Sequence, residues 1–256
     1  MTNILLVGYG RMGTALAKTW LTLENIEITV VSPELFCEQN IHKTVSSIQN
    51  DYCPDIIVFA VKPQVMDVVL HDYKTFCNQE TLIISIAAGY TLAKIKSVLP
   101  GKVVRVMPNL PITVGCGVYG IFPDDQCNSV DRELINKLFS PSGQILWLSC
   151  EDEVDRITAI SGSGPAYFYL FTEMIQQAAI NIGFNPDQAR ILAESTFIGA
   201  AELMKEMRLS PSILRDQVTS PGGTTAAAIQ SFINNGIEEI ASQAVKAAYN
   251  RAKELS

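Results

Sequence analysis

Short apolar runs alternate with longer segments of helical pattern in the first part of the chain. Runs rich in valine, isoleucine and leucine cover residues 3–7, 26–31, 55–61, 81–87 and 102–107. This alternation is typical of parallel β-α-β units, whose strands are buried on both faces. Two further strands are predicted at 116–122 and 144–148, with a helix at about 129–139 between them. Residues 1–150 are therefore predicted to form a Rossmann-like, doubly wound α/β domain.

Beyond residue 150 the strand pattern stops, and helical segments separated by glycine and proline take its place. Asn185 and Ser210 each precede a proline, so each is predicted to cap a helix whose first residue is that proline. The apolar segment 166–182 is interrupted by polar residues, which favours a buried helix of a soluble protein over a membrane span. Residues 151–256 are predicted to form an all-helical second domain.

Composition excludes several classes of function. The net charge is -7 and basic residues never run together, so nucleic acid is not an expected partner. The first strand begins without a cationic lead or a cleavage site, which favours a cytoplasmic protein. Six scattered cysteines and two histidines form no metal-ligand spacing, so reduced thiols and no structural metal are expected.

The first motif that points to chemistry is Gly8-Tyr-Gly-Arg-Met-Gly13, between a predicted strand and a predicted helix. The first glycine permits a tight turn, the second lets a pyrophosphate approach the backbone, and the third allows the helix to pack closely on the strand. The motif predicts dinucleotide binding. At the end of the second strand, Ser32 can donate to a 2′-phosphate and Glu34 follows a proline, which favours NADPH and leaves NADH open.

Two later strands end in small residues at what should be the same edge of the sheet, in Ala60-Val-Lys-Pro63 and Ser85-Ile-Ala-Ala-Gly89. Small residues there would let a flat ring approach, and Lys62 is expected to line the cleft. The second motif, Ser220-Pro-Gly-Gly-Thr-Thr225, stands where a strongly apolar helix begins. Unpaired N–H groups and the positive end of the helix dipole favour an anion at that position, so an acidic group is expected to bind at 220–225.

Together with Arg105-Val-Met-Pro-Asn-Leu-Pro111 and Ala159-Ile-Ser-Gly-Ser-Gly-Pro-Ala-Tyr167, these motifs make the chain resemble pyrroline-5-carboxylate reductase over nearly its full length. The resemblance implies NAD(P)H-dependent reduction of 1-pyrroline-5-carboxylate to L-proline, the final step of proline biosynthesis. It also implies that the helical domain pairs two subunits and that the substrate is held between the domains. Hydride transfer to a cyclic imine needs positioning more than strong bases, and neither histidine lies in a motif.

The resemblance also assigns residues to roles. The substrate carboxylate would meet Ser220, Gly223 and Thr224, while the catalytic Thr225 hydroxyl would donate a hydrogen bond to the imine nitrogen and relay a proton. Two departures from the family pattern, Leu110 for a usual threonine and Arg11 for a frequent asparagine, leave cofactor preference open. The cofactor contacts implied by the resemblance are Val7, Gly8, Tyr9, Gly10, Arg11, Met12, Ser32, Ala60, Val61, Lys62, Pro63, Ile86, Ala87, Ala88 and Gln217.

Two alternatives remain open. A β-hydroxyacid dehydrogenase shares the amino-terminal glycine turn and a helical domain but needs a helix lysine as acid and base, for which Lys205 and Lys246 are available. A non-catalytic dinucleotide-binding dimer would keep the fold without the chemistry, against which the Thr224-Thr225 pair argues. In every case the apolar helical domain predicts a homodimer or a higher homo-oligomer.

Overall fold

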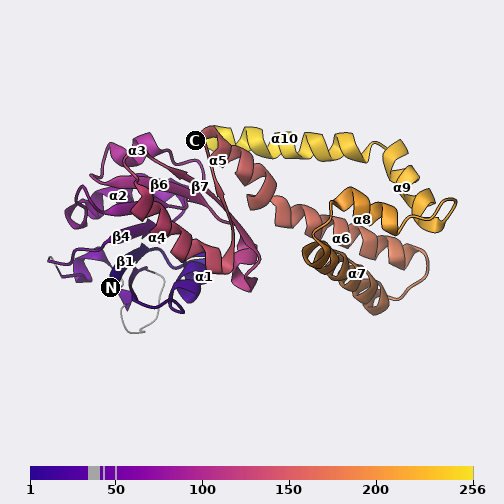
Figure 1. The fold of residues 1–256 in the computed structure, drawn as a ribbon, viewed down its shortest axis with the longest axis horizontal. Helices are drawn as coiled ribbons and strands as arrows, with labels where there is room; N and C mark the ends of the chain where they lie inside the picture. Colours follow the sequence, from indigo (N-terminus) through magenta and orange to yellow (C-terminus); the bar gives the residue numbers. More distant parts are fainter. Residues whose placement is uncertain (34–40, 43, 50, 256) are drawn as a thin grey trace. The chain divides into compact units, whose positions relative to one another are not determined.

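The computed structural model describes residues 1–33, 41–42, 44–49 and 51–255. The chain divides into two compact units, one formed by Met1–Ser163 with Ala247–Ser256 and the other by Gly164–Lys246 (Figure 1). The division into domains at residue 150 stays a prediction. Over the described residues, no helix combines the length and the apolar character that crossing a bilayer requires.

The first unit is built on one eight-stranded sheet of order β3-β2-β1-β4-β5-β6-β7-β8. Neighbouring strands are parallel except β6 and β7, which are antiparallel. The seven predicted strands are confirmed with small shifts at their ends, and the two-residue β3 was not predicted. The strands are β1 (Thr2–Val7), β2 (Ile26–Val31), β3 (Ile41–His42), β4 (Ile56–Phe59), β5 (Leu82–Ser85), β6 (Lys102–Met107), β7 (Gly117–Pro123) and β8 (Gly143–Trp147).

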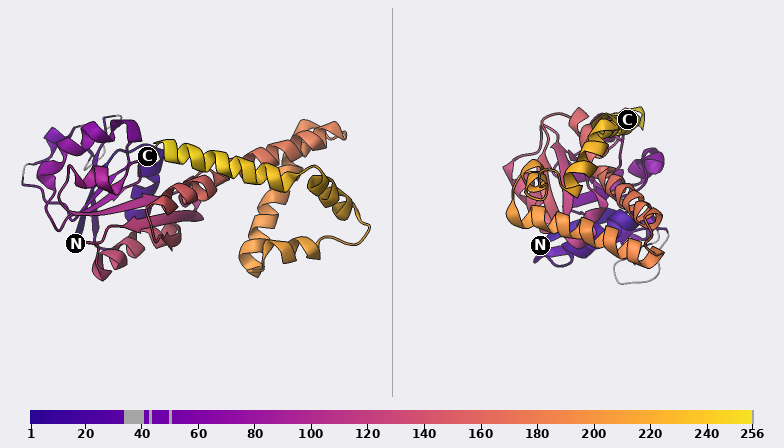
Figure 2. Two further views of the ribbon diagram at one scale, coloured as in Figure 1. Left: turned by 90° about the horizontal axis from the view of Figure 1, so that it is seen from above. Right: turned by 90° about the vertical axis from the view of Figure 1, so that its right-hand side faces the viewer.

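Helices cover both faces of this sheet, which confirms the doubly wound α/β prediction (Figures 1 and 2). On one face, α1 (Arg11–Trp20) and α4 (Ser129–Phe139) pack on alternate strand residues such as Ile4 and Leu6. On the other, α2 (Met66–Asp72) and α3 (Leu92–Lys96) pack on Leu5 and the residues aligned with it. Because both faces are covered, β4 is wholly apolar and β5 is apolar up to its last residue, Ser85, as their sequence indicates.

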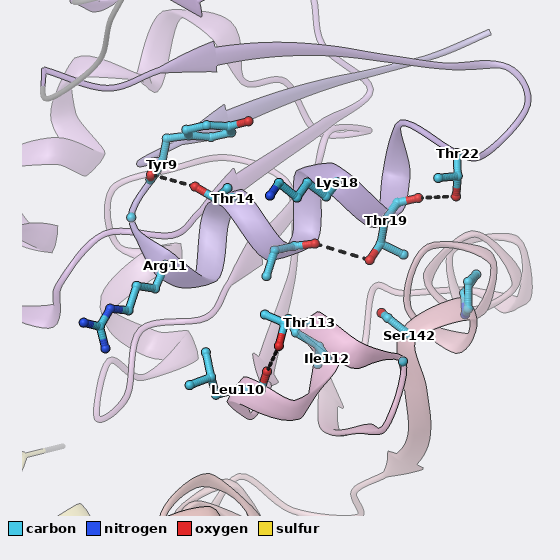
Figure 3. A pocket seen from close by; sticks show the side chains of 14 residues that line it. Tyr9, Arg11, Thr14, Lys18, Thr19, Thr22, Leu110, Ile112, Thr113 and Ser142 are labelled. Atoms are coloured by element: carbon cyan, nitrogen blue, oxygen red, sulfur yellow. Dashed lines mark hydrogen bonds between the residues drawn. The ribbon is translucent and has the colours of Figure 1, made fainter.

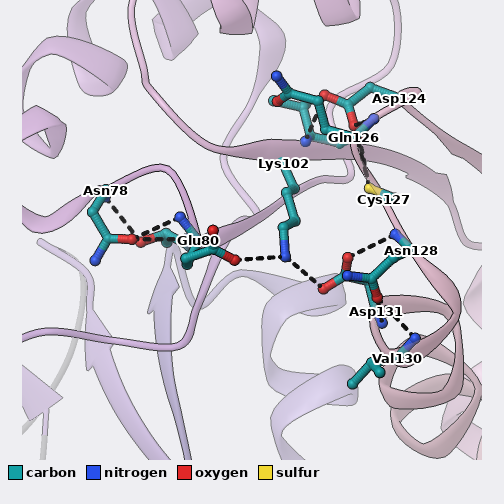
Figure 4. A network of polar contacts seen from close by, with 11 residues as sticks. Asn78, Glu80, Lys102, Asp124, Gln126, Cys127, Asn128, Val130 and Asp131 are labelled. Carbon is teal, nitrogen blue, oxygen red and sulfur yellow. Dashed lines mark hydrogen bonds and ion pairs between the residues drawn. The ribbon is translucent and has the colours of Figure 1, made fainter.

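The amino-terminal edge of the sheet is held by a polar network around Lys102, the first residue of β6 (Figure 4). The Lys102 ammonium contacts Glu80 at 3.0 Å and Asp131 at 3.4 Å. Asp131 also accepts from the Asn128 backbone N–H, while the Asn128 side chain caps the start of α4. One cation thereby joins a loop, a strand and a helix start at the edge opposite the strand ends where the predicted nucleotide residues lie.

The second unit is entirely helical, which confirms the prediction for this region. Asn185 caps α7 by accepting from the Gln188 N–H at 2.9 Å, and Ser210 caps α8 by accepting from the Ile213 N–H at 3.4 Å. Both predicted caps are therefore confirmed. Helix α6 contacts α7 and α9 through aromatic pairs with ring centroids 5.8 and 5.9 Å apart. The helices are α6 (Gly164–Asn181), α7 (Pro186–Met207), α8 (Pro211–Gln217), α9 (Thr224–Asn234) and α10 (Ile237–Leu255), whose residues from Ala247 onward belong to the first unit.

Candidate active site

The three glycines of the β1–α1 turn have three different surroundings. Gly8 has φ +96°, and a Cβ there would lie 2.6 Å from the Ala60 carbonyl oxygen. A Cβ on Gly13 would lie 2.4 Å from the Gly8 carbonyl oxygen, so the helix packs directly on the turn. A Cβ on Gly10 would meet no described atom within 4 Å, and Gly10 is exposed. The turn thus leaves open space at its second glycine, where a dinucleotide phosphate would approach the backbone.

The predicted nucleotide residues of the first unit lie at one edge of the sheet. Strands β2, β1, β4 and β5 are parallel neighbours, so their carboxyl ends meet there. The residue that follows each of β1, β4 and β5 continues the backbone hydrogen bonding between neighbouring strands. The N–H groups of Gly8, Ala60 and Ile86 donate to the carbonyl oxygens of Val31, Val7 and Phe59, respectively. The chain leaves β1 toward β2 and returns to β4 on the other side of β1. This reversal is the switch point at which open α/β sheets bind ligands.

The exposure of these residues separates side chains that can reach a ligand from those that only shape the edge. Gly10, Arg11 and Lys62 are exposed, whereas Val7, Gly8 and Ala87 are buried. Ser32 directly follows β2 and is 4% exposed, and its N–H donates to the His42 carbonyl oxygen at 2.9 Å. Its neighbour Glu34 lies outside the described residues. The remaining predicted residues of the edge, Tyr9, Met12, Ala60, Val61, Pro63, Ile86 and Ala88, are half-buried.

A groove of about 760 Å³ runs along α1 from the glycine turn to beyond the last turn of the helix (Figure 3). Of the predicted nucleotide residues, only Tyr9, Gly10 and Arg11 line it. The opposite wall includes Leu110, Ile112 and Thr113 of the short 3-10 helix η4 (Leu110–Val114). Arg11 and Leu110, the two departures from the family pattern, therefore face the same groove. The groove is separate from the ends of β4 and β5.

The loop after β6, which belongs to the Arg105–Pro111 motif, is held in place by the side chain of Asn109. The Asn109 side chain accepts from the Val118 N–H at 2.8 Å and donates to the Ser161 carbonyl oxygen at 3.0 Å. Ser161 belongs to a π-helical turn, Thr158–Gly162, after α5 (Asp152–Ile157). Such turns are frequent at functional sites. Asn109 is 7% exposed, so its amide fastens the loop to β7 and to the Ser-Gly-Ser-Gly segment.

The predicted anion site lies at the start of α9, in the second unit. Gly222 has φ +72°, and the Gly223 N–H donates to the Ser220 carbonyl oxygen at 3.0 Å. Gly223 is the N-cap residue, and no side chain of the described residues caps the helix. The first intrahelical bond runs from the Ala227 N–H to Gly223. The N–H groups of the first helical turn thus remain available to a ligand carboxylate, beside the half-buried Thr225.

Other predicted or alternative residues of the second unit lie on its surface. Gln217 is the last residue of α8 and is exposed. Lys205 keeps a side-chain exposure of 69% and lies 4.0 Å from Glu202 on the same helix. Lys246 is exposed as well. Neither lysine has the enclosed setting that an acid and base catalyst of a β-hydroxyacid dehydrogenase would need.

Sequence reasoning missed the contacts that fasten the loop after β5. The Tyr90 hydroxyl donates to the Asp67 carboxylate at 2.6 Å, which joins this loop to α2. Burial, together with that carboxylate, raises the pKa of Tyr90 to about 12. At the end of the same loop, the Leu92 N–H donates to the Glu151 carboxylate at 2.7 Å. Because the partners in each contact are far apart in the chain, no local sequence pattern predicts these hydrogen bonds.

Comparison with known proteins agrees with both halves of this description. Residues 151–255 match the family model described as pyrroline-5-carboxylate reductase dimerisation, and residues 3–89 match that of the coenzyme F420-dependent NADP oxidoreductases. A pyrroline-5-carboxylate reductase of Pseudomonas aeruginosa is 40% identical over 204 residues, which cover 79% of this chain and 75% of that protein.

Two solved structures match over nearly the whole chain. That of a pyrroline-5-carboxylate reductase from Coxiella burnetii is 33% identical with a TM-score of 0.90, covering 100% of this chain and 98% of that one. The pyrroline carboxylate reductase of Plasmodium falciparum, solved with NADP bound, is 31% identical with a TM-score of 0.86, covering 99% and 98%. The chain belongs to the pyrroline-5-carboxylate reductase family.

Proposed function

We propose that this chain reduces 1-pyrroline-5-carboxylate to L-proline with NADPH or NADH, the last step of proline biosynthesis. The observation that carries the proposal is the uncapped start of α9 in a chain of this family. A cyclic imine with one carboxylate suits a site that offers backbone N–H groups and a neighbouring hydroxyl. Membership of the family over the full length supports the same substrate.

Ser220, Gly223 and Thr224 are proposed to bind the substrate carboxylate. A Cβ on Gly223 would lie only 2.7 Å from the Ser220 Oγ. Glycine at this position therefore leaves room for the Ser220 hydroxyl. Gly222, with its positive φ, turns the backbone into the helix. Anchoring the acid group in this way would fix the orientation of the imine ring, which matters because a misplacement of 1 Å can cost about a hundredfold in rate.

Thr225 is proposed as the catalytic residue. It is the second residue of α9 and is half-buried, so its hydroxyl stands beside the proposed carboxylate site. Its Oγ1 would donate a hydrogen bond to the substrate nitrogen and pass on the proton that the amine product requires. A hydrogen bond and a proton given to the nitrogen make the imine carbon a better electrophile, so no strong base is needed.

The glycine turn and the strand ends of the first unit are proposed to hold the nucleotide. Residues 7–12 would bind the pyrophosphate, and Ser32 would bind the adenosine ribose. Residues 60–63 and 86–88 would contact the rest of the nucleotide, and Gln217 would add a polar contact. The open space at Gly10 fits a phosphate group. When bound, the reduced nicotinamide supplies the hydride that reduces the C=N bond.

Replacing Thr225 tests the proposed chemistry. Thr225→Ala should lower kcat by roughly 10- to 1000-fold, the range for one lost oriented hydrogen bond. Thr225→Ser keeps the hydroxyl and should recover most of the activity. Ser231→Ala is the matched control, because Ser231 is an exposed hydroxyl residue of the same helix. The assay follows nucleotide absorbance with 1-pyrroline-5-carboxylate. Wild-type turnover in Thr225→Ala would reject the role of Thr225, and an inactive wild-type protein would reject the function.

The second unit is proposed to form a homodimer or a higher homo-oligomer. Large apolar side chains of α6 and α7 are exposed in the single chain, including Phe168 at 57%, Tyr169 at 61% and Ile198 at 59%. Apolar surface of this extent marks a protein interface. The match of residues 151–255 to a dimerisation model supports the same conclusion. Light scattering that showed a monomer would contradict it.

Two further expectations complete the proposal. The cysteines among the described residues, Cys53, Cys77, Cys116, Cys127 and Cys150, are free thiols, which supports a reducing compartment such as the cytoplasm. The net charge of -7 supports the expectation that nucleic acid is not a partner.

A further inference from the structure

Glu151 joins three segments of the first unit that are far apart in the sequence. It is the N-cap residue of α5, and its Oε1 accepts from the Leu92 N–H at 2.7 Å and from the Arg105 Nη1 at 2.9 Å. Leu92 opens α3, and Arg105 lies in β6. The Arg105 side chain is only 3% exposed, so this carboxylate is the counter-ion of a buried cation. One carboxylate thus ties the loop after β5 to the neighbouring strand.

The next residue, Asp152, ties the end of α10 to the same place. The Tyr249 hydroxyl donates to the Asp152 carboxylate at 2.9 Å, and the Lys253 ammonium lies 3.6 Å from it. The last turn of α10 also packs against the loop after β5. At Gly89, which has φ +71°, a Cβ would lie 2.3 Å from the Leu255 carbonyl oxygen. Both acidic residues at the start of α5 therefore secure elements that border residues 89–92.

The loop itself has little freedom left. Tyr90 is held to α2 through Asp67, Leu92 is held by Glu151, and Gly89 is covered by the end of α10. Residues 86–88, which the proposed function places at the nucleotide, come immediately before this fastened segment. A ligand that depends on their backbone positions depends on these contacts as well.

We propose that Glu151 is a positioning residue for nucleotide binding, whose carboxylate sets the backbone of residues 86–92 through the Leu92 N–H. This inference rests on the proposed function, because it assumes that residues 86–88 contact the nucleotide. Glu151 touches neither nucleotide nor substrate in this proposal. Its removal leaves the Leu92 N–H without its acceptor and leaves Arg105 as a buried cation without its counter-ion, and Arg105 Nη2 already has no partner among the described residues.

Three variants of the full-length protein test the proposal. Glu151→Ala removes the acceptor, whereas Glu151→Gln keeps an oxygen that can accept from Leu92 and from Arg105. Glu153→Ala is the matched control, because the Glu153 carboxylate lies in the same helical turn and accepts from the nearby Ser149 N–H. Should Glu151→Ala not fold, Tyr90→Phe removes only the hydroxyl that holds the same loop to Asp67.

Titration calorimetry with NADPH alone and amide hydrogen exchange of residues 86–92 are the measurements. Glu151→Ala, or Tyr90→Phe in its place, should bind NADPH roughly 3- to 30-fold more weakly, the range of coupling carried by a packed network. Exchange should rise within 86–92, while KM for 1-pyrroline-5-carboxylate at saturating nucleotide stays unchanged. Glu151→Gln and Glu153→Ala should remain within about threefold of wild type.

Wild-type affinity in Glu151→Ala, or a rise in exchange spread evenly over the first unit, would overturn the positioning role while leaving the proposed function intact. A wild-type protein that binds neither NADPH nor NADH would instead overturn the proposed function and this inference with it.

Discussion

The three glycines of the β1–α1 turn should respond differently to the same added methyl group. Gly8→Ala places a Cβ 2.6 Å from the Ala60 carbonyl oxygen at a φ of +96°. The left-handed conformation costs roughly 1–2 kcal/mol and the contact with backbone about 1–3 kcal/mol more. Gly13→Ala keeps an ordinary helical conformation, so only the contact with Gly8 at 2.4 Å counts, again about 1–3 kcal/mol.

Gly10→Ala should have the opposite profile. The new Cβ meets no described atom within 4 Å, and the backbone angles of Gly10, φ −67° and ψ −169°, suit alanine. The folded state is therefore not strained, and the free energy of unfolding should rise by roughly 0.4–1 kcal/mol through the less flexible unfolded chain. Where a phosphate approaches this position, however, the methyl group should weaken nucleotide binding by roughly 5- to 150-fold, the equivalent of about 1–3 kcal/mol of overpacking.

The assay pairs thermal unfolding without ligand with nucleotide titration at a temperature where all variants are folded. Gly8→Ala should lower Tm by roughly 4–20 °C, and Gly13→Ala by less, at about 2–4 °C for each kcal/mol. Gly10→Ala should unfold at or slightly above the wild-type temperature and bind nucleotide poorly. The reasoning is refuted if Gly10→Ala unfolds as early as Gly8→Ala, or if it binds nucleotide as tightly as the wild type.

Two further outcomes follow from contacts away from the nucleotide edge. Lys102→Met should lower the free energy of unfolding by about 1–3 kcal/mol, because it removes the cation between Glu80 and the largely buried Asp131 (Figure 4). KM for the nucleotide should stay unchanged. A denaturant titration that shows no shift of the unfolding midpoint would contradict the prediction. Burial raises the pKa of Cys77 and of Cys127 to about 12. Both thiols should therefore resist alkylation by iodoacetamide at pH 8 for as long as the protein stays folded. Rapid labelling of either residue, detected by mass spectrometry, would show that its thiol is not protected.

Much of the fold follows from local pattern. The five apolar runs of the first unit predicted β1, β2, β4, β5 and β6, because strands covered on both faces need apolar side chains on both sides. Asn185 and Ser210 predicted their helix starts, because a cap acts within four residues of chain. The glycine turn was predictable for the same reason, since the conformational needs of Gly8 and Gly13 arise from a single strand-turn-helix unit and the strand beside it.

The contacts that hold the site in place are of another kind. Glu151 meets Leu92 across 59 positions of sequence, and no residue near either one marks the pair. The short strand β3, the antiparallel pairing of β6 with β7, and the packing of Leu255 on Gly89 were likewise not predicted. Each depends on which distant segments share a surface.

Periodicity and turn chemistry depend on residues that are close together in the sequence, so strands, helices, helix caps and both glycine-rich turns could be predicted from the sequence alone. Strand order, the neighbours of Arg105 and the fastening of residues 89–92 arise only when many long-range contacts form together. The free energy of burying these surfaces is a sum over the whole unit, and no short stretch of sequence contains that sum.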